Sequence, residues 1–230
     1  MAEQQILAYH GWGFDGGAWD AWRECLPDGF TLEAFDRGYF GRPRQPDFRG
    51  KGARIVMAHS FGLHLVPRER LEEADLLVIL GGFRDFHPRA ARFRHRSRQV
   101  LAQMCERFSE EPEAVLGKFY ANTWHPASPP KLDLEGMDRE LMKEDLEKLG
   151  ESTLEAERMA AAGRVCIFHG TDDLIVPKSK GRDLYGSLEP QASYFEIRNA
   201  GHALPFTHTA QCLKLMMPEA ENLFPQKTQN

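Results

Sequence analysis

One stretch decides the fold of this chain: Arg54-Ile55-Val56-Met57-Ala58-His59-Ser60-Phe61-Gly62. An apolar run breaks at a serine between small and turn-permitting residues, which predicts a buried strand, a tight turn and the start of a helix. In such a turn the hydroxyl of Ser60 projects at the carboxyl end of the strand, and the small residues Ala58 and Gly62 relieve the crowding. The stretch therefore predicts an exposed nucleophile, although a serine that only caps a helix would fit the same short pattern.

The regions on either side of this stretch alternate between strand and helix patterns. The run at 75–80 is continuously apolar, as expected for a parallel strand that is buried on both faces. This order predicts an α/β fold with a mostly parallel sheet covered by helices. Besides the strand that ends at the serine, the strand candidates are 5–9, 31–35, 75–80, 164–169 and 192–197.

Residues 83–163 interrupt this alternation. They contain no strand-like run, and their apolar residues recur at helical spacing on either side of a proline-rich loop at 124–130. We interpret the segment as an inserted helical lid of roughly four helices. The predicted organisation is a core domain formed by 1–82 and 164–230, with the lid insertion at 83–163.

Composition and charge narrow the classes of function. The chain has 230 residues, 42% of them hydrophobic, and a formal net charge of -5, which argues against nucleic acid as its main partner. The four cysteines show no paired spacing, which predicts reduced thiols rather than disulfides or a zinc site. The first residues carry no leader pattern, and no window reaches the ~18 apolar residues of a membrane helix. We therefore expect a cytoplasmic monomer that does not bind membranes.

Two further residues complete a catalytic pattern with Ser60. A serine hydroxyl is a poor nucleophile at neutral pH, so it needs a base and a third group that orients the base. Asp173 follows the fifth strand candidate, and His202 follows the sixth. Both are therefore expected at the carboxyl edge of the sheet, the edge that carries Ser60.

The order Ser60, Asp173, His202 resembles that of the α/β-hydrolase superfamily, and the resemblance covers about residues 5–82 and 164–217. In detail the chain resembles the carboxylesterases that cleave pimeloyl-[acyl-carrier protein] methyl ester in biotin synthesis. Two segments carry this second resemblance. They are His10-Gly11-Trp12-Gly13 and Asn199-Ala200-Gly201-His202-Ala203-Leu204-Pro205-Phe206-Thr207-His208.

The resemblance implies roles for several residues. The backbone N–H groups of Trp12 and Phe61 would form the oxyanion hole, and no cofactor and no metal ion would be needed. The side chains of Trp12, Phe83 and Phe119 would bind the substrate, although core packing explains Phe83 equally well.

Some positions depart from the family pattern or leave a choice open. Ala58 stands where glycine is usual, Leu63 stands where a small residue is common, and 41–54 is too short for a well-formed helix. None of these departures removes a catalytic group. Asp172 is a rival for the acid, and the family spacing favours Asp173.

A cluster of basic residues stands out in this acidic chain. Six arginines lie between Arg84 and Arg98, and Asp85 is the one acid among them. A solvated helix face is one interpretation. The other is a docking patch for an acidic acyl-carrier protein, as lid arginines provide in the resembled esterases. The patch residues are Arg89, Arg92, Arg94, Arg96 and Arg98.

These features predict a serine carboxylesterase that hydrolyses pimeloyl-[acyl-carrier protein] methyl ester to pimeloyl-[acyl-carrier protein] and methanol. A general short-chain carboxylesterase or thioesterase with the same Ser60, Asp173 and His202 is the alternative. A non-catalytic ligand-binding protein is the third possibility, because a fold alone does not determine function.

Overall fold

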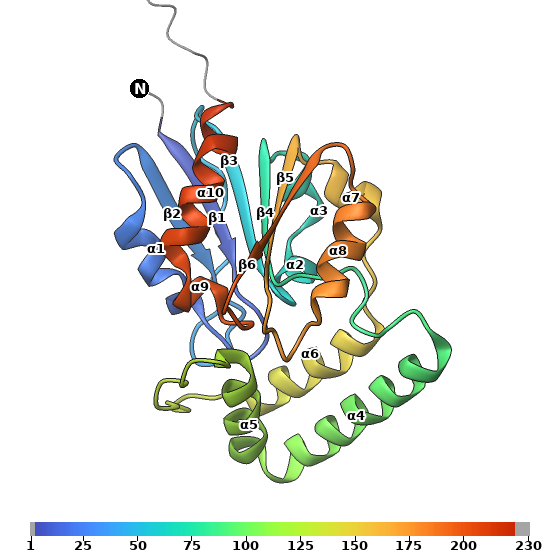
Figure 1. Cartoon of the computed structure of the whole chain (residues 1–230). Coiled ribbons are helices and arrows are strands. Elements are labelled where there is room, and N and C mark those ends of the chain that lie inside the picture. The colour runs from blue at the N-terminus through green and yellow to red at the C-terminus, as the bar shows by residue number, and fades with distance from the viewer. Residues whose placement is uncertain (1–2, 224–230) are drawn as a thin grey trace, which may run out of the picture.

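The computed structural model describes residues 3–223, so the ends of the predicted core segments 1–82 and 164–230 lie outside the described residues. Six strands form one sheet in the order β2-β1-β3-β4-β5-β6, and every neighbouring pair is parallel (Figure 1). The strands are β1 (Gln4–Tyr9), β2 (Phe30–Phe35), β3 (Arg54–His59), β4 (Leu76–Leu80), β5 (Arg164–Gly170) and β6 (Ala192–Ile197).

Successive residues of the strands face two separate apolar layers. In β3, Ile55 and Met57 pack in the layer that includes α1, α9 and α10, whereas Val56 and Ala58 pack in the layer that includes α3, α7 and α8 (Figure 1). This alternation follows from the two-residue period of a strand. The helices of these layers are α1 (Asp20–Cys25), α3 (Arg68–Glu72), α7 (Ala156–Ala160), α8 (Lys178–Gly186), α9 (Leu204–Thr207) and α10 (Thr209–Glu221).

Two short elements connect the layers to the site. A 3-10 turn, η1 (Gly16–Trp19), leads into α1, and α2 (Gly62–Leu65) follows β3 directly. Pro67 lies two residues after the end of α2 and precedes α3, which agrees with the expectation that the helix after Ser60 is short. None of the helices in the described part of the chain combines the length and the apolar content that crossing a bilayer requires.

A helical insertion stands at the carboxyl end of the sheet (Figure 1). Its helices are α4 (Ala91–Glu110), α5 (Pro112–Trp124) and α6 (Arg139–Glu151). Phe108, Leu116 and Met142 from these helices form one apolar cluster with Trp12 and Phe61 of the core. The insertion therefore covers the edge of the sheet at which Ser60 lies.

The fourth helix expected for this insertion belongs to the core. Leu154, Met159 and Ala162 pack in the same apolar layer as Val165 and Ile167 of β5. The helical pattern of this segment was read correctly, but the burial of its apolar side chains places α7 on the sheet. The part of the insertion that covers the site therefore ends with α6.

A buried carboxylate fixes α6 to the core. Asp145 accepts hydrogen bonds from Nε and Nη2 of Arg37, at 2.6 and 3.0 Å, and from the hydroxyl of Tyr39 at 2.8 Å. Burial alone would raise the pKa of Asp145, but hydrogen bonds from Arg37, Lys148 and Tyr39 lower it below its ordinary value. The indole of Trp12 donates to the carbonyl of Met142 at 2.7 Å. These contacts hold α6 against the loops that follow β1 and β2.

His64 connects α2 to the two ends of the insertion. Its Nδ1 lies 2.6 Å from the hydroxyl of Ser152, and its Nε2 lies 3.0 Å from the carbonyl of Phe83. A carbonyl can only accept, so Nε2 carries the proton and Nδ1 accepts from the serine. Burial lowers the pKa of His64 to about 4, which keeps the ring neutral at neutral pH.

This burial predicts a contribution to acid sensitivity. Because the unfolded chain binds a proton at His64 more readily than the folded protein, stability falls as pH drops below about 6.5. Between about pH 7.5 and about pH 5, the share of His64 is about 2 kcal/mol of unfolding free energy. We expect His64→Gln to lose about that much less than the wild type over this range, measured by urea unfolding. His95→Gln, at an exposed position of α4, is the control, and an unchanged loss in His64→Gln would contradict the argument.

Candidate active site

Ser60 occupies a strained turn between β3 and α2. Its φ of 53° lies in the left-handed region, which is uncommon for a residue with a side chain. The backbone N–H of Ser60 donates to the carbonyl of Leu80 at 3.0 Å, which continues the pairing of β3 with β4. A Cβ at Gly62 would lie 2.4 Å from the carbonyl oxygens of Tyr9 and His10. Only glycine fits there, so the turn and the end of β1 pack backbone to backbone.

The loops after β5 and β6 bring an acid and a base together. Nδ1 of His202 lies 2.7 Å from Oδ2 of Asp173, and both side chains have 0% exposure. The other carboxylate oxygen, Oδ1, accepts the backbone N–H groups of Ile175 and Val176, each at 2.8 Å. Asp172 instead accepts a hydrogen bond from the hydroxyl of its neighbour Thr171. Of the two rival acids, the structure therefore places Asp173 against the histidine.

The hydrogen bonds also determine which atoms can react. Burial alone would raise the pKa of Asp173, yet the charge and hydrogen bond of His202 hold it below its ordinary value. Asp173 is therefore ionised, and Nδ1 of His202 carries the proton that it shares with the carboxylate. Nε2 of His202 is buried and has no hydrogen-bond partner among residues 3–223. That nitrogen can accept the proton of a nucleophilic hydroxyl.

Two other buried histidines support this pair. Nε2 of His59 lies 2.9 Å from the carbonyl of His202, and the two rings are 4.8 Å apart. Nε2 of His169 lies 2.8 Å from the carbonyl of Val176 and 3.6 Å from Oδ2 of Asp173. Burial lowers the pKa of His59 to about 3 and lowers that of His169, so both rings are neutral. These roles were not predicted from the sequence, where the one available signal is the position of the two histidines at the ends of β3 and β5.

Across the described residues, no three His, Cys, Asp or Glu side chains are placed to hold one metal ion.

The glycine-rich loop after β1 lies against the serine. A Cβ at Gly11 would lie 3.1 Å from Cβ of Ser60, so the loop backbone approaches the nucleophile closely. His10 braces this loop, because its Nε2 accepts the backbone N–H of Arg37 at 3.0 Å. Trp12 and Phe61, the two residues predicted to supply the oxyanion donors, are buried with exposures of 4% and 2%. Trp12 follows Gly11, and Phe61 follows Ser60, so both lie beside the nucleophile.

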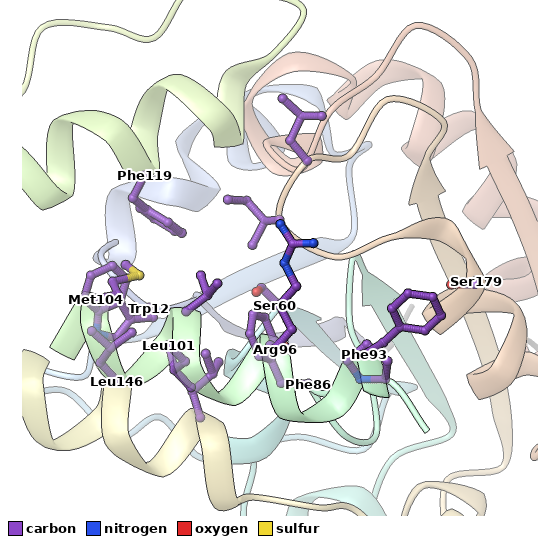
Figure 2. Close-up of a pocket in the computed structure, with 16 residues that line it drawn as sticks. Trp12, Ser60, Phe86, Phe93, Arg96, Leu101, Met104, Phe119, Leu146 and Ser179 are labelled. Carbon is purple, nitrogen blue, oxygen red and sulfur yellow. The ribbon is translucent and has the colours of Figure 1, made fainter. Parts of the chain in front are cut away.

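A cavity of about 630 Å³ opens over Ser60. Figure 2 shows Trp12, Met104 and Leu146 on one side of Ser60, with Phe93 and Ser179 on the other. Most of the lining is aliphatic or aromatic, and half of the lining residues come from α4 and α6. The lining residues are Trp12, Ser60, Phe86, Pro88, Phe93, Arg96, Ser97, Val100, Leu101, Met104, Phe119, Leu146, Leu149, Leu174, Ile175 and Ser179.

The predicted substrate-binding aromatics differ in their placement. Trp12 and Phe119 line the cavity, and their rings meet edge to face with centroids 5.0 Å apart. Phe83 is not among the lining residues; it is fully buried, with its ring 4.9 Å from His64 and 5.5 Å from Phe86. Phe86 takes the position at the cavity that the sequence analysis gave to Phe83.

The arginines of the predicted patch have different surroundings. Arg96 lines the cavity and is its one charged lining residue. Arg94 forms an ion pair with Asp85 and donates to the carbonyl of Pro88, so its charge is used within the fold. The guanidinium of Arg92 lies 4.4 Å from the ring centroid of Phe93. Arg89 and Arg98 are exposed, as are Arg92 and Arg96.

No family model and no curated protein sequence matches this chain. Its structure resembles a hydrolase from Oleispira antarctica with a TM-score of 0.78 at 15% identity, covering 96% of this chain and 92% of that one. The esterase EaEST from Exiguobacterium antarcticum gives 0.76 at 11% identity, with coverage of 96% and 93%. A bromoperoxidase from Bacillus anthracis gives 0.75 at 15%, with coverage of 96% and 94%. With its parallel sheet and flanking helices, the chain has the α/β-hydrolase fold.

The two adjacent aspartates provide a matched test of the site. We expect Asp173→Asn to lower kcat for a p-nitrophenyl ester by about 10³- to 10⁴-fold, because the imidazole loses the carboxylate that fixes its tautomer. Asp172→Asn should keep nearly the wild-type kcat, since its carboxylate does not touch His202. Equal losses in the two variants would contradict the assignment.

Gly81 follows β4 and lies against the Asp173–His202 pair. Its φ is 58°, and a Cβ there would lie 3.1 Å from Nδ1 of His202 and 3.6 Å from Oδ2 of Asp173. Gly81→Ala is expected to lower kcat by about 100-fold, because displacing the imidazole by a fraction of an ångström misaligns proton transfer.

Gly29 is the control for this substitution. It also has a positive φ, of 91°, but a Cβ there would meet nothing within 4 Å. Gly29→Ala should therefore lose about 1–2 kcal/mol of stability from backbone strain and keep its activity. If Gly81→Ala loses stability but keeps the wild-type kcat, Gly81 does not position the base.

Proposed function

We propose that this protein is a serine carboxylic ester hydrolase. The observation that carries the proposal is the buried hydrogen bond between Asp173 and His202. It lies at the edge of the sheet where Ser60 lines an apolar cavity. Such an acid, base and nucleophile are the groups that acyl transfer requires. The structural neighbours include esterases and an enol-lactonase, and this reaction class agrees with those activities.

The reaction would proceed in two halves. Oγ of Ser60 forms a bond to the ester carbonyl carbon while its proton moves to Nε2 of His202, and Asp173 stabilises the imidazolium. The carbon–oxygen bond to the alcohol then breaks, and Nε2 returns the proton to the leaving oxygen. Water attacks the acyl-enzyme with Nε2 again taking the proton, and the acid leaves as Oγ is reprotonated.

The negative charge of each tetrahedral intermediate would fall on one oxygen. The backbone N–H groups of Trp12 and Phe61 are the proposed donors to that oxygen. Removing one such donor typically costs about 3 kcal/mol of transition-state stabilisation. The close approach of Gly11 to Ser60 supports this role, since it brings the loop backbone within reach of the reacting carbon.

The proposed substrate is pimeloyl-[acyl-carrier protein] methyl ester, as the family resemblance implies for biotin synthesis. The apolar lining from α4 and α6 suits a chain of methylene groups. The large apolar side chains exposed among the described residues are Phe93, Val100 and Leu174, and all three line this cavity. An apolar rim is what an acyl chain would cross as it enters. Methanol would be the leaving alcohol.

The proposed partner is the acyl-carrier protein that carries this chain. Arg89, Arg92, Arg96 and Arg98 are exposed, and none of them forms an ion pair with a described residue. Arg96 places one of these charges at the cavity, which supports docking of an acidic partner around its mouth. Arg94 is excluded from this role by its pairing with Asp85.

The proposal predicts a preference between substrates. We expect hydrolysis of pimeloyl-[acyl-carrier protein] methyl ester with a kcat/KM at least about 100-fold above that of a short p-nitrophenyl ester, decreasing with added salt. Ser60→Ala should abolish both activities. Hydrolysis of the short ester alone would indicate a general carboxylesterase or thioesterase, and binding without hydrolysis of either would indicate a non-catalytic protein.

A further inference from the structure

The cavity over Ser60 continues into a groove on the surface. A depression of about 360 Å³ shares the lining residues Phe86, Pro88, Ser97, Ile175 and Ser179 with that cavity. A third depression, of about 180 Å³, shares Arg89, Lys180 and Asp183 with the second. The three depressions therefore adjoin one another from the nucleophile, past the amino end of α4 and the start of α8, to a small pocket, and we refer to this succession as the path. Figure 2 shows its beginning, where Phe93 and Ser179 lie on the same side of Ser60.

The far end of this path carries an excess of positive charge. Four cationic side chains line the small pocket, Arg84, Arg89, Arg94 and Lys180, against the carboxylates of Asp85 and Asp183. Asp85 is neutralised by Arg94. Three cations and one carboxylate remain around the pocket.

None of these three cations forms an ion pair with any described residue. Nε of Arg84 donates to the carbonyl of Leu154 at 3.0 Å. Nζ of Lys180 donates to the carbonyls of Asp85, at 2.6 Å, and His87. Lys180 is only 8% exposed, and the hydrogen-bond partners of its ammonium are both neutral carbonyls. Burial lowers its pKa, although the nearby charges of Asp85 and Asp183 act in the opposite direction. A nearly buried ammonium whose direct hydrogen-bond partners are neutral, in a pocket with more cations than carboxylates, favours the binding of an anion.

We propose that this pocket, the anion pocket formed by Arg84, Arg89 and Lys180, binds the phosphate ester of the substrate. The inference rests on the proposed function, because a carrier-linked acyl chain is attached through a phosphopantetheine arm. Arg89 supplies an exposed guanidinium with free N–H groups that match phosphate oxygens in a two-point contact. Arg84 and Lys180 add charge from the wall of the pocket.

The path explains why the phosphate would lie there. The ester is held at Ser60, and the apolar acyl chain fills the cavity beneath Phe93 and Leu174. The polar arm then follows the groove, and its single phosphate reaches the cationic end. The arm would thus be recognised independently of the surface of the carrier protein. The 4′-phosphate of this arm is part of a phosphodiester in the carrier protein and part of a diphosphate in coenzyme A, so either source would bring an anionic phosphate to the pocket.

The central comparison of the test is between the pantetheine and 4′-phosphopantetheine thioesters, which differ in one phosphate. The methyl pimeloyl thioesters of pantetheine, 4′-phosphopantetheine, coenzyme A and the acyl-carrier protein would be hydrolysed by wild type and by Arg89→Ala. We expect the phosphate to lower KM about tenfold relative to pantetheine in the wild type, with kcat unchanged. Arg89→Ala should remove this difference, and Arg89→Lys should restore part of it. The carrier arm and the coenzyme A arm separate the two sources of the phosphate.

Arg107→Ala is the matched control, because Arg107 is an exposed arginine at the other end of α4. It should retain the tenfold effect. Equal KM values for pantetheine and 4′-phosphopantetheine thioesters, unchanged by Arg89→Ala, would overturn the anion pocket.

A binding measurement separates this result from failure of the proposed function. Isothermal titration of Ser60→Ala with 4′-phosphopantetheine and with pantetheine requires no turnover. Tighter binding of the phosphorylated compound, lost in Ser60→Ala/Arg89→Ala, would support the pocket even if the methyl ester of none of these substrates is hydrolysed. Equal binding of the two compounds would count against the pocket whatever ester the enzyme cleaves.

Discussion

The left-handed turn at Ser60 is the constraint on which the site depends. A non-glycine residue in this region costs about 1–3 kcal/mol, so surrounding contacts must hold it there. They do so through close backbone packing. Gly62 meets the carbonyls at the end of β1, Gly11 meets Ser60 itself, and the Ser60 N–H is tied to β4. Because all six strands are parallel, their carboxyl ends share one edge, and the loops carrying Asp173 and His202 converge on the nucleophile that this turn exposes.

Burial makes the Asp173–His202 pair effective and also makes it costly. A carboxylate with no exposed surface requires compensation, and Asp173 receives it from two backbone N–H groups and the imidazole. If the neighbouring rings of His59 and His169 were protonated, their positive charges would oppose the protonation of His202. Burial lowers the pKa of both rings and keeps them neutral. His59 has a further effect. It directly precedes Ser60 and contacts the carbonyl of His202, so the segment that presents the nucleophile also fixes the backbone of the base.

The sequence was sufficient for features that depend on local pattern. Short apolar runs bounded by turn residues located the strands, and motif spacing selected Asp173 over Asp172. Features that depend on distant contacts were missed. The helical period of residues 156–160 does not say whether a helix covers the site or the sheet, and burial of Met159 decides it. Likewise, a run of arginines looks uniform until Arg94 meets Asp85 and Arg96 reaches the cavity. Phe83 and Phe86 differ only in side-chain direction, which no spacing rule supplies.

Chemistry and recognition are divided between two parts of this fold. The reacting groups come from the core loops, whereas α4 and α6 supply half of the residues that line the cavity. This wall must be held accurately, because an acyl pocket selects chain length by its shape. On one side, Asp145 ties α6 to the loop after β2, and on the other, Lys180 of α8 binds the carbonyls that precede α4. Lys180 also lines the anion pocket. A single buried ammonium thus holds the insertion in place and contributes the charge that an anionic arm would meet, so the support of the cavity and the recognition of what enters it share one side chain.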